Sequence, residues 1–118
     1  MEKKPTRYYS DLQENYIKKE FNGQKNSNSG AGLFRKGDVL LPSSSTLVEC
    51  KTCTEDKQSF SIKKEWMAKN KEEAFAMRCE NSCICFNFGP NQQNYFVIDE
   101  KLMHFLVDKL EEEYEKNV

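Results

Sequence analysis

The chain has 118 residues, a length that suits one domain with one hydrophobic core and leaves no room for a second. It contains no run of eighteen apolar residues, and no apolar segment follows its basic N-terminus, so we expect neither a membrane span nor a secretion signal. We therefore expect a cytoplasmic protein, or one in the host cytoplasm if its origin is viral. Its five cysteines, an odd number, are typical of reduced thiols rather than of a disulfide framework.

The net charge of −1 is unevenly distributed along the chain. Residues 1–37 carry eight Lys/Arg against four Asp/Glu, which gives +4, and residues 51–71 carry six against three, which gives +3. From Asp99 onward there are seven acids and three bases, which gives −4. A phosphate backbone responds to the local field rather than to the total charge, so this distribution is compatible with DNA binding.

The first expected element is a helix. Residues 1–9 are basic and show no clear period, which indicates an N-terminal arm or a frayed first turn. Ser10 is the expected N-cap, with Gln13 as its capping-box partner. The helix then runs to about Asn22, and Gly23 closes it.

Glu14 is an acid on the apolar face of this helix, because it shares that face with Ile17 and Phe21. It is either a partly exposed carboxylate or first-turn charge favoured by the helix dipole, or a third acid that reaches a metal site.

The segment 23–32, GQKNSNSGAG, has no apolar residue before Ala31, and we expect a mobile loop there. It is either a plain linker or a place where small residues let the backbone approach a phosphate. Arg35 and Lys36 follow, as a solvated charge pair or as phosphate ligands.

Residues 39–41 and 46–48 are two short apolar runs separated by the turn residues PSSS, a pattern that predicts a β-hairpin. If Leu41 pairs with Thr46, Asp38 falls directly opposite Glu49. Side chains alternate along a strand, so Lys51 follows Glu49 onto the same face.

The β-carbons of directly opposed residues lie about 4.5–5.5 Å apart, and like charges placed there repel each other unless a cation offsets the repulsion. Oxygen ligands of this kind suit Mg²⁺, which is commonly held by one or two carboxylates, water and substrate phosphate. A metal would activate water, and a lysine beside it would orient or deprotonate that water, so the group predicts phosphodiester hydrolysis. The alternative is a chance Glu-x-Lys and two solvated acids on an exposed sheet face.

A second helix is expected from Ile62 to about Met77, with Trp66, Met67, Ala74 and Met77 toward the sheet. Lys63 and Lys64 lie in its first turn, where a cation is unfavourable. They are either phosphate contacts or solvated helix-start lysines.

Residues 83–88 and 95–98 are expected to be neighbouring strands joined by a turn at 89–91. Asp99 is the expected N-cap of a last helix that ends at about Glu115. Its expected buried stripe is Leu102, Leu106 and Leu110. These elements predict an α/β domain with a mixed central β-sheet flanked by helices, in two or three layers.

The cysteines offer a different reading. Cys50 with Cys53, and Cys79 with Cys83, have spacings that could supply four thiolates to a structural zinc. The chain would then be a small zinc-stabilised nucleic-acid-binding module. A third reading keeps the fold without catalysis, as a DNA-binding protein.

The order of Asp38, a hairpin, and Glu49-x-Lys51 on an apolar strand resembles the PD-(D/E)XK nuclease superfamily. Gly37-Asp38 stands where Pro-Asp is usual in that family. The resemblance spans roughly Glu14 to Val97. It is closest to the archaeal and phage Holliday-junction resolvases, through NSGA at 28–31, RKGDV at 35–39, VECKT at 48–52 and SIKK at 61–64.

This resemblance implies a restriction-endonuclease-like core and one Mg²⁺ or Mn²⁺ held by Asp38, Glu49 and the backbone carbonyl of Cys50. It implies that Glu14 supports that metal or a second one, and that Lys51 positions the attacking water. The implied substrate is a four-way junction or other branched DNA, cut by a two-fold homodimer, although another DNA substrate is the alternative. The implied DNA contacts are Ser29, which lies near the scissile strand, and Arg35, Lys36, Lys63 and Lys64.

Overall fold

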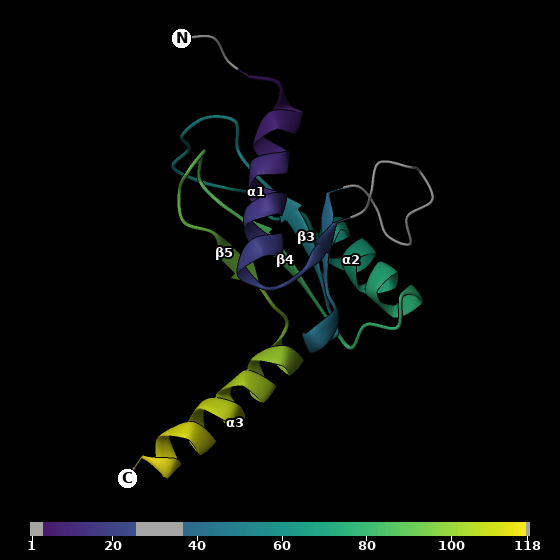
Figure 1. Ribbon diagram of the computed structural model, residues 1–118, viewed down its shortest axis with the longest axis vertical. Helices are drawn as coiled ribbons and strands as arrows, with labels where there is room; N and C mark the ends of the chain where they lie inside the picture. Colours follow the sequence, from purple (N-terminus) through teal and green to yellow (C-terminus); the bar gives the residue numbers. More distant parts are fainter. Residues whose placement is uncertain (1–3, 26–36, 118) are drawn as a thin grey trace.

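The computed structural model describes residues 4–25 and 37–117 (Figure 1). Its elements in chain order are α1 (Thr6–Glu20), β1 (Gln24–Lys25), β2 (Asp38–Leu41), a 3₁₀ turn (Pro42–Ser44), β3 (Thr46–Lys51), α2 (Lys64–Ala76), β4 (Asn81–Phe86), β5 (Tyr95–Val97) and α3 (Glu100–Lys116). Within these residues no helix is both long and apolar enough to cross a membrane.

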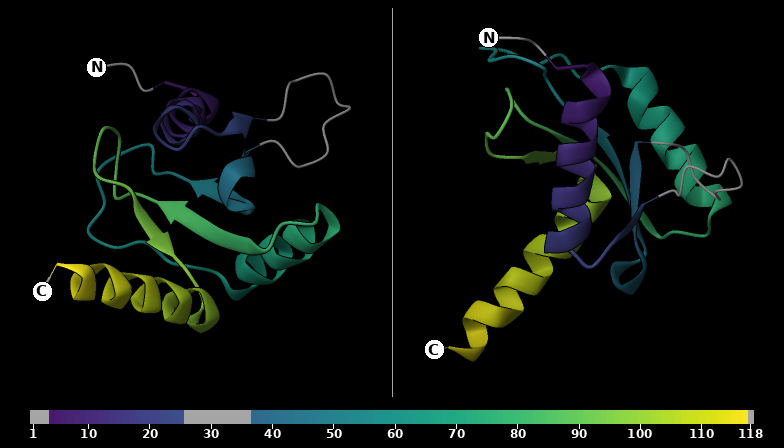
Figure 2. Two further views of the ribbon diagram at one scale, coloured as in Figure 1. Left: turned by 60° about the horizontal axis from the view of Figure 1, so that its bottom comes forward. Right: turned by 45° about the horizontal axis from the view of Figure 1, so that its top comes forward.

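The five strands form one mixed sheet in the order β1-β2-β3-β4-β5. The β3–β4 pair is parallel and the other three pairs are antiparallel. Helix α1 lies over one face of the sheet, and α2 lies over the other (Figure 2). The expected α/β domain with a mixed central sheet is confirmed. Strand β1 was not expected, because its two residues belong to the segment predicted to be a loop.

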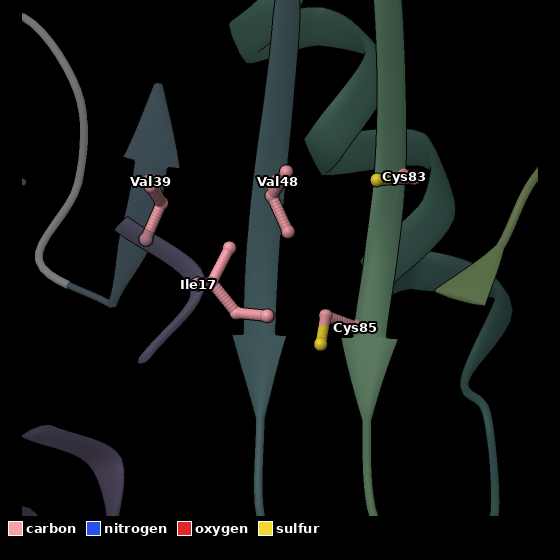
Figure 3. Packing of buried hydrophobic residues seen from close by; sticks show 5 residues of the cluster. All are labelled: Ile17, Val39, Val48, Cys83 and Cys85. Carbon is pink, nitrogen blue, oxygen red and sulfur yellow. The ribbon is translucent and has the colours of Figure 1, made fainter. Parts of the chain in front are cut away.

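The core between α1 and the sheet is built from one residue of the helix and four of the strands. Ile17 packs against them, and all five side chains are buried: Ile17, Val39, Val48, Cys83 and Cys85 (Figure 3). Val39 and Val48 are cross-strand partners on this face. Because side chains alternate along a strand, the residues on either side of them, Asp38 and Glu49, point to the face that α2 covers.

Helix α1 begins earlier than the sequence predicted. Its N-cap is Pro5, which makes no side-chain capping bond, so Ser10 lies inside the helix and the capping box is wrong. The proline φ of −59° suits a helix start, and the ion pair between Arg7 and Asp11, one turn apart, stabilises the added turn. The helix ends at Glu20, two residues before the predicted end, and Asn22 takes the left-handed conformation (φ 53°). Gly23 closes the turn as predicted, because its N–H donates to the Lys18 carbonyl at 2.8 Å.

Helix α2 and strand β4 differ from their predicted bounds by one or two residues at each end. Strand β4 covers residues 81–86 rather than 83–88. The helix begins at Lys64 rather than Ile62, because Lys63 is extended (φ −85°, ψ 134°). Ala74 is buried toward the sheet as predicted. Asn70, which has no apolar side chain, is buried beside it and donates to the Leu47 carbonyl at 3.4 Å. This amide ties α2 to β3.

Helix α3 is capped by Asp99 as predicted, because the Asp99 carboxylate accepts the Leu102 N–H at 2.9 Å. The predicted buried stripe is wrong, since Leu106 is 41% and Leu110 is 56% exposed. The helix extends away from the sheet beyond its first turns (Figure 1), so the described chain leaves most of its apolar side uncovered. It therefore presents exposed apolar side chains, among them Met103, Phe105, Leu106 and Leu110.

Candidate active site

The hairpin of β2 and β3 has the predicted register, with Leu41 opposite Thr46 and Asp38 opposite Glu49. The Cys50 N–H donates to the Gly37 carbonyl at 3.1 Å. Hydrogen-bonded and non-hydrogen-bonded pairs alternate, so Asp38 and Glu49 form a non-hydrogen-bonded pair, whose Cα atoms lie about 4.5 Å apart. The two residues are only 3% and 8% exposed. The structure therefore brings two carboxylates together in a largely buried position.

Lys51 completes this group on the same face of β3. Its Nζ lies 3.3 Å from Oε2 of Glu49 and 4.4 Å from the centroid of the Trp66 ring. An ammonium held over an indole face gains a cation–π attraction that also fixes its position. The Lys51 side chain keeps 32% of its surface exposed, so solvent reaches the amine. We call Asp38, Glu49 and Lys51 the acid–lysine cluster.

Of the two predicted DNA contacts at the start of α2, Lys63 lies beside this cluster. The Lys63 Nζ lies 5.7 Å from the centroid of the Trp66 ring, so Lys51 and Lys63 share one indole. Lys64 is the first residue of α2 and is exposed. Trp66, expected to face the sheet, is partly buried, and its ring also supports the cluster lysine. Three predicted DNA contacts lie outside the described residues: Ser29, Arg35 and Lys36.

Glu14 projects from α1, on the face of the sheet opposite to that of Glu49. It is fully buried and accepts two hydrogen bonds from Arg7, at 2.9 and 3.0 Å, and Lys25 lies 3.9 Å away. Burial raises the pKa of the Glu14 carboxyl, against the opposing effect of the Arg7 guanidinium. The structure shows Glu14 paired with these two cations. Its role at a metal stays a prediction.

Gln13 is a buried residue near the cluster that sequence reasoning did not assign to it. Its Nε2 lies 2.9 Å from the Lys51 carbonyl and 3.3 Å from the Cys85 carbonyl, and so joins the ends of β3 and β4. The same amide lies 3.3 Å from Oδ1 of Asn94, after the turn that follows β4. In the sequence, the only signal for this role was that Gln13 is an amide next to Glu14. The capping-box pattern assigned Gln13 to Ser10 instead.

The cysteines of the zinc alternative are not gathered. Across residues 4–25 and 37–117, no three or more His, Cys, Asp or Glu side chains form a group that could hold a metal. A hydrogen bond with Cys85, together with burial, raises the pKa of Cys50 well above its ordinary value. Burial raises the pKa of Cys83 to about 12. Both thiols are therefore protonated near neutral pH, whereas a zinc ligand is a thiolate.

No model of a known protein family matches the chain. Nor does any curated protein or solved structure. What bears on function is therefore the chemistry of the acid–lysine cluster. It offers hard oxygen donors for a divalent cation and one amine beside them, next to a helix start that carries two more lysines.

Proposed function

We propose that the chain is a metal-dependent DNA endonuclease that hydrolyses phosphodiester bonds, with a restriction-endonuclease-like core of the PD-(D/E)XK type. Holliday junctions or other branched DNA are its proposed substrates. The observation that supports this proposal is the direct opposition of Asp38 and Glu49 at buried positions of a β-hairpin, with Lys51 on the same face. A merely structural hairpin gains nothing from placing two acids there, because like charges directly opposite each other are destabilising.

The donor set fits Mg²⁺ or Mn²⁺. Asp38 and Glu49 would hold the ion, and the resemblance adds the Cys50 carbonyl. When bound, such an ion supplies Lewis acidity toward the phosphate and lowers the pKa of a coordinated water. Two carboxylates without histidine or thiolate ligands favour these hard cations over zinc.

The chain's own residues then position the reacting groups. Lys51 holds the attacking water and offsets charge on the phosphate, because Glu49 and Trp66 keep its amine at the cluster. Lys63, which lies by the same indole, and Lys64 contact neighbouring phosphates. Ser29, Arg35 and Lys36 would contribute from the segment that precedes β2. The Asp38 and Glu49 carboxylates repel the phosphate until the ion is present, so cleavage depends on the metal.

A junction has to be cut on two strands, and a two-fold homodimer supplies two symmetric sites. We propose that copies of the chain pair through α3, whose exposed apolar side includes Met103, Leu106 and Leu110. The pattern of apolar residues three and four apart suits packing against a second helix. We propose a cytoplasmic location for this enzyme.

The decisive experiment incubates the purified protein with a labelled four-way junction, a replication fork and a linear duplex, in Mg²⁺ or in EDTA. We expect metal-dependent cleavage that is strongest on branched DNA. Asp38→Asn, Glu49→Gln and Lys51→Ala should each abolish cleavage while folding and most DNA binding remain. Glu72→Gln and Lys69→Ala, which change exposed residues of α2, are the matched controls and should cleave normally. Tight binding without cleavage in any divalent cation would instead identify a DNA-binding protein.

A further inference from the structure

A cavity of about 820 Å³ lies on the face of the sheet opposite to the acid–lysine cluster. It is bounded by α1, by the start of the connection after β3, by the turn after β4 and by β5. Its volume falls in the range of about 300–1,000 Å³ that is typical of small-molecule and cofactor sites. The described part of the chain thus contains a second hollow that the proposed cleavage chemistry does not use.

Aromatic rings form one wall of this cavity. Tyr16 and Phe21 come from the α1 side, and Phe96 comes from β5. Each is at least 40% exposed, and the rings of Phe21 and Phe96 meet edge to face with centroids 5.8 Å apart. Aromatic rings of a hydrophobic core are normally buried. These three rings are exposed, so their surfaces are available to a ligand.

Amide side chains form the other wall, from α1 and from the connection between β4 and β5. Gln13 is only 5% exposed, and its Oε1 has no hydrogen-bond partner among the described residues. Asn94 accepts from Gln13 at 3.3 Å and from Asn87 at 3.4 Å. Among the described residues of the lining, Glu20 is the one that carries a charge, and neither lysine nor arginine contributes. This lining disfavours a phosphate, but its rings and amides suit a planar, hydrogen-bonding ring.

Strand β3 connects the cavity to the acid–lysine cluster. The Lys51 side chain belongs to the cluster, whereas its carbonyl accepts from Gln13 of the cavity at 2.9 Å. The next residue, Thr52, lines the cavity itself. A nucleotide whose phosphate lies at the cluster therefore has its base within reach of the cavity around the end of this strand.

We propose that the cavity binds an unstacked nucleobase of the DNA, next to the phosphate that is cut. This inference rests on the proposed nuclease function for the phosphate, but base binding needs no metal. Taking a base out of a duplex costs free energy, and the cost is smallest where the base is already unpaired. The enzyme therefore selects DNA with an unpaired nucleotide at or beside the branch point over a continuous duplex.

The test measures binding in EDTA, where no cleavage occurs, by fluorescence anisotropy. The probes are a duplex with a single bulged 5-iodouracil and the same duplex fully paired. We expect the native protein to bind the bulged duplex more tightly. Irradiation should cross-link the iodouracil to Tyr16, Phe21 or Phe96, identified by mass spectrometry.

Variants of the aromatic wall separate stacking from packing. Phe96→Ala should weaken binding of the bulged duplex by about 5- to 150-fold, the usual cost of losing one base–aromatic stack, and should leave the paired duplex unaffected. Phe96→Leu, which keeps an apolar side chain but no ring, should lose most of the same preference. Phe75→Ala removes an exposed ring from α2, outside the cavity and the proposed pairing surface, and should change neither affinity.

Equal affinity for the two duplexes, or cross-links only outside the cavity lining, would overturn the inference. So would a change in oligomeric state of Phe96→Ala with no loss of bulge preference, because the aromatic wall would then be a protein contact. Metal-dependent cleavage without bulge preference would leave the nuclease proposal standing and remove this one. Bulge preference with cross-links in the cavity, but no cleavage in Mg²⁺ or Mn²⁺, would support base binding and remove the nuclease proposal.

Discussion

Glu49→Gln should remove the stabilisation of the fold by Mg²⁺ or Mn²⁺. Glu49 and Asp38 are directly opposed across the hairpin and largely buried. Two unit charges about 5 Å apart interact with about 3 kcal/mol at an effective dielectric constant of about 20. A divalent cation between them reverses that repulsion, and an amide in place of one carboxylate removes half of the attraction. The native protein should therefore bind the ion far more tightly than the variant.

The size of the effect follows from linkage. An ion at ten times its Kd adds about 1.4 kcal/mol to the free energy of unfolding of a protein that binds it only when folded. For a domain of this length, about 1 kcal/mol shifts Tm by roughly 4 °C, so the native protein should gain about 6 °C. At the same ion concentration, Glu49→Gln should gain less than about 1 °C.

The assay is thermal unfolding followed by circular dichroism across a titration of MgCl₂ or MnCl₂ at constant ionic strength. Glu72→Gln, an exposed acid on α2, is the control and should keep the native response. An equal shift for the native protein and for Glu49→Gln would refute the reasoning, because the ion would then bind elsewhere.

Three further predictions concern the fold and assembly. Gly23→Ala should lower the free energy of unfolding by about 1–3 kcal/mol in urea, because an added Cβ would meet Val39 Cγ1 at 2.7 Å. The raised pKa of Glu14 means that the folded state binds more protons than the unfolded chain, so stability should fall as pH rises from the ordinary value of 4.5 through the folded pKa. Glu14→Gln should flatten that dependence in urea melts at several pH values. Leu106→Glu should give monomers by light scattering, whereas Phe75→Glu, at an exposed position of α2, should not.

Each of these has a contradicting result. An unchanged urea midpoint for Gly23→Ala would mean that the turn relaxes away from β2. A pH dependence of Glu14→Gln equal to that of the native protein would assign the titration to another group. A native protein that is already monomeric would remove α3 as the pairing surface.

The hairpin was predictable because its signals are local. A four-residue turn fixes which residues pair, and the two-residue period of a strand then fixes which side chains share a face. The register of Asp38 and Glu49 follows from those two facts alone. The Asp99 cap and the closure at Gly23 were likewise local, since each depends on a hydrogen bond to a residue at most five positions away.

The rest depends on contacts between distant parts of the chain. Gln24 and Lys25 have no strand propensity of their own, and they form β1 only by pairing with β2. Gln13 looked like a capping residue, but its partners are 38 and 72 residues away. The leucines of α3 have the period of a buried face, and periodicity alone does not say whether the covering partner belongs to the same molecule.

The most direct test of the proposed function is cleavage of a labelled four-way junction by the native protein and by Glu49→Gln, at protein concentrations where both bind the junction equally. We expect the native protein to cut in Mg²⁺ and to stop in EDTA, and Glu49→Gln to bind without cutting in either. Cleavage by Glu49→Gln at the native rate would contradict the assignment of the acid–lysine cluster as the active site.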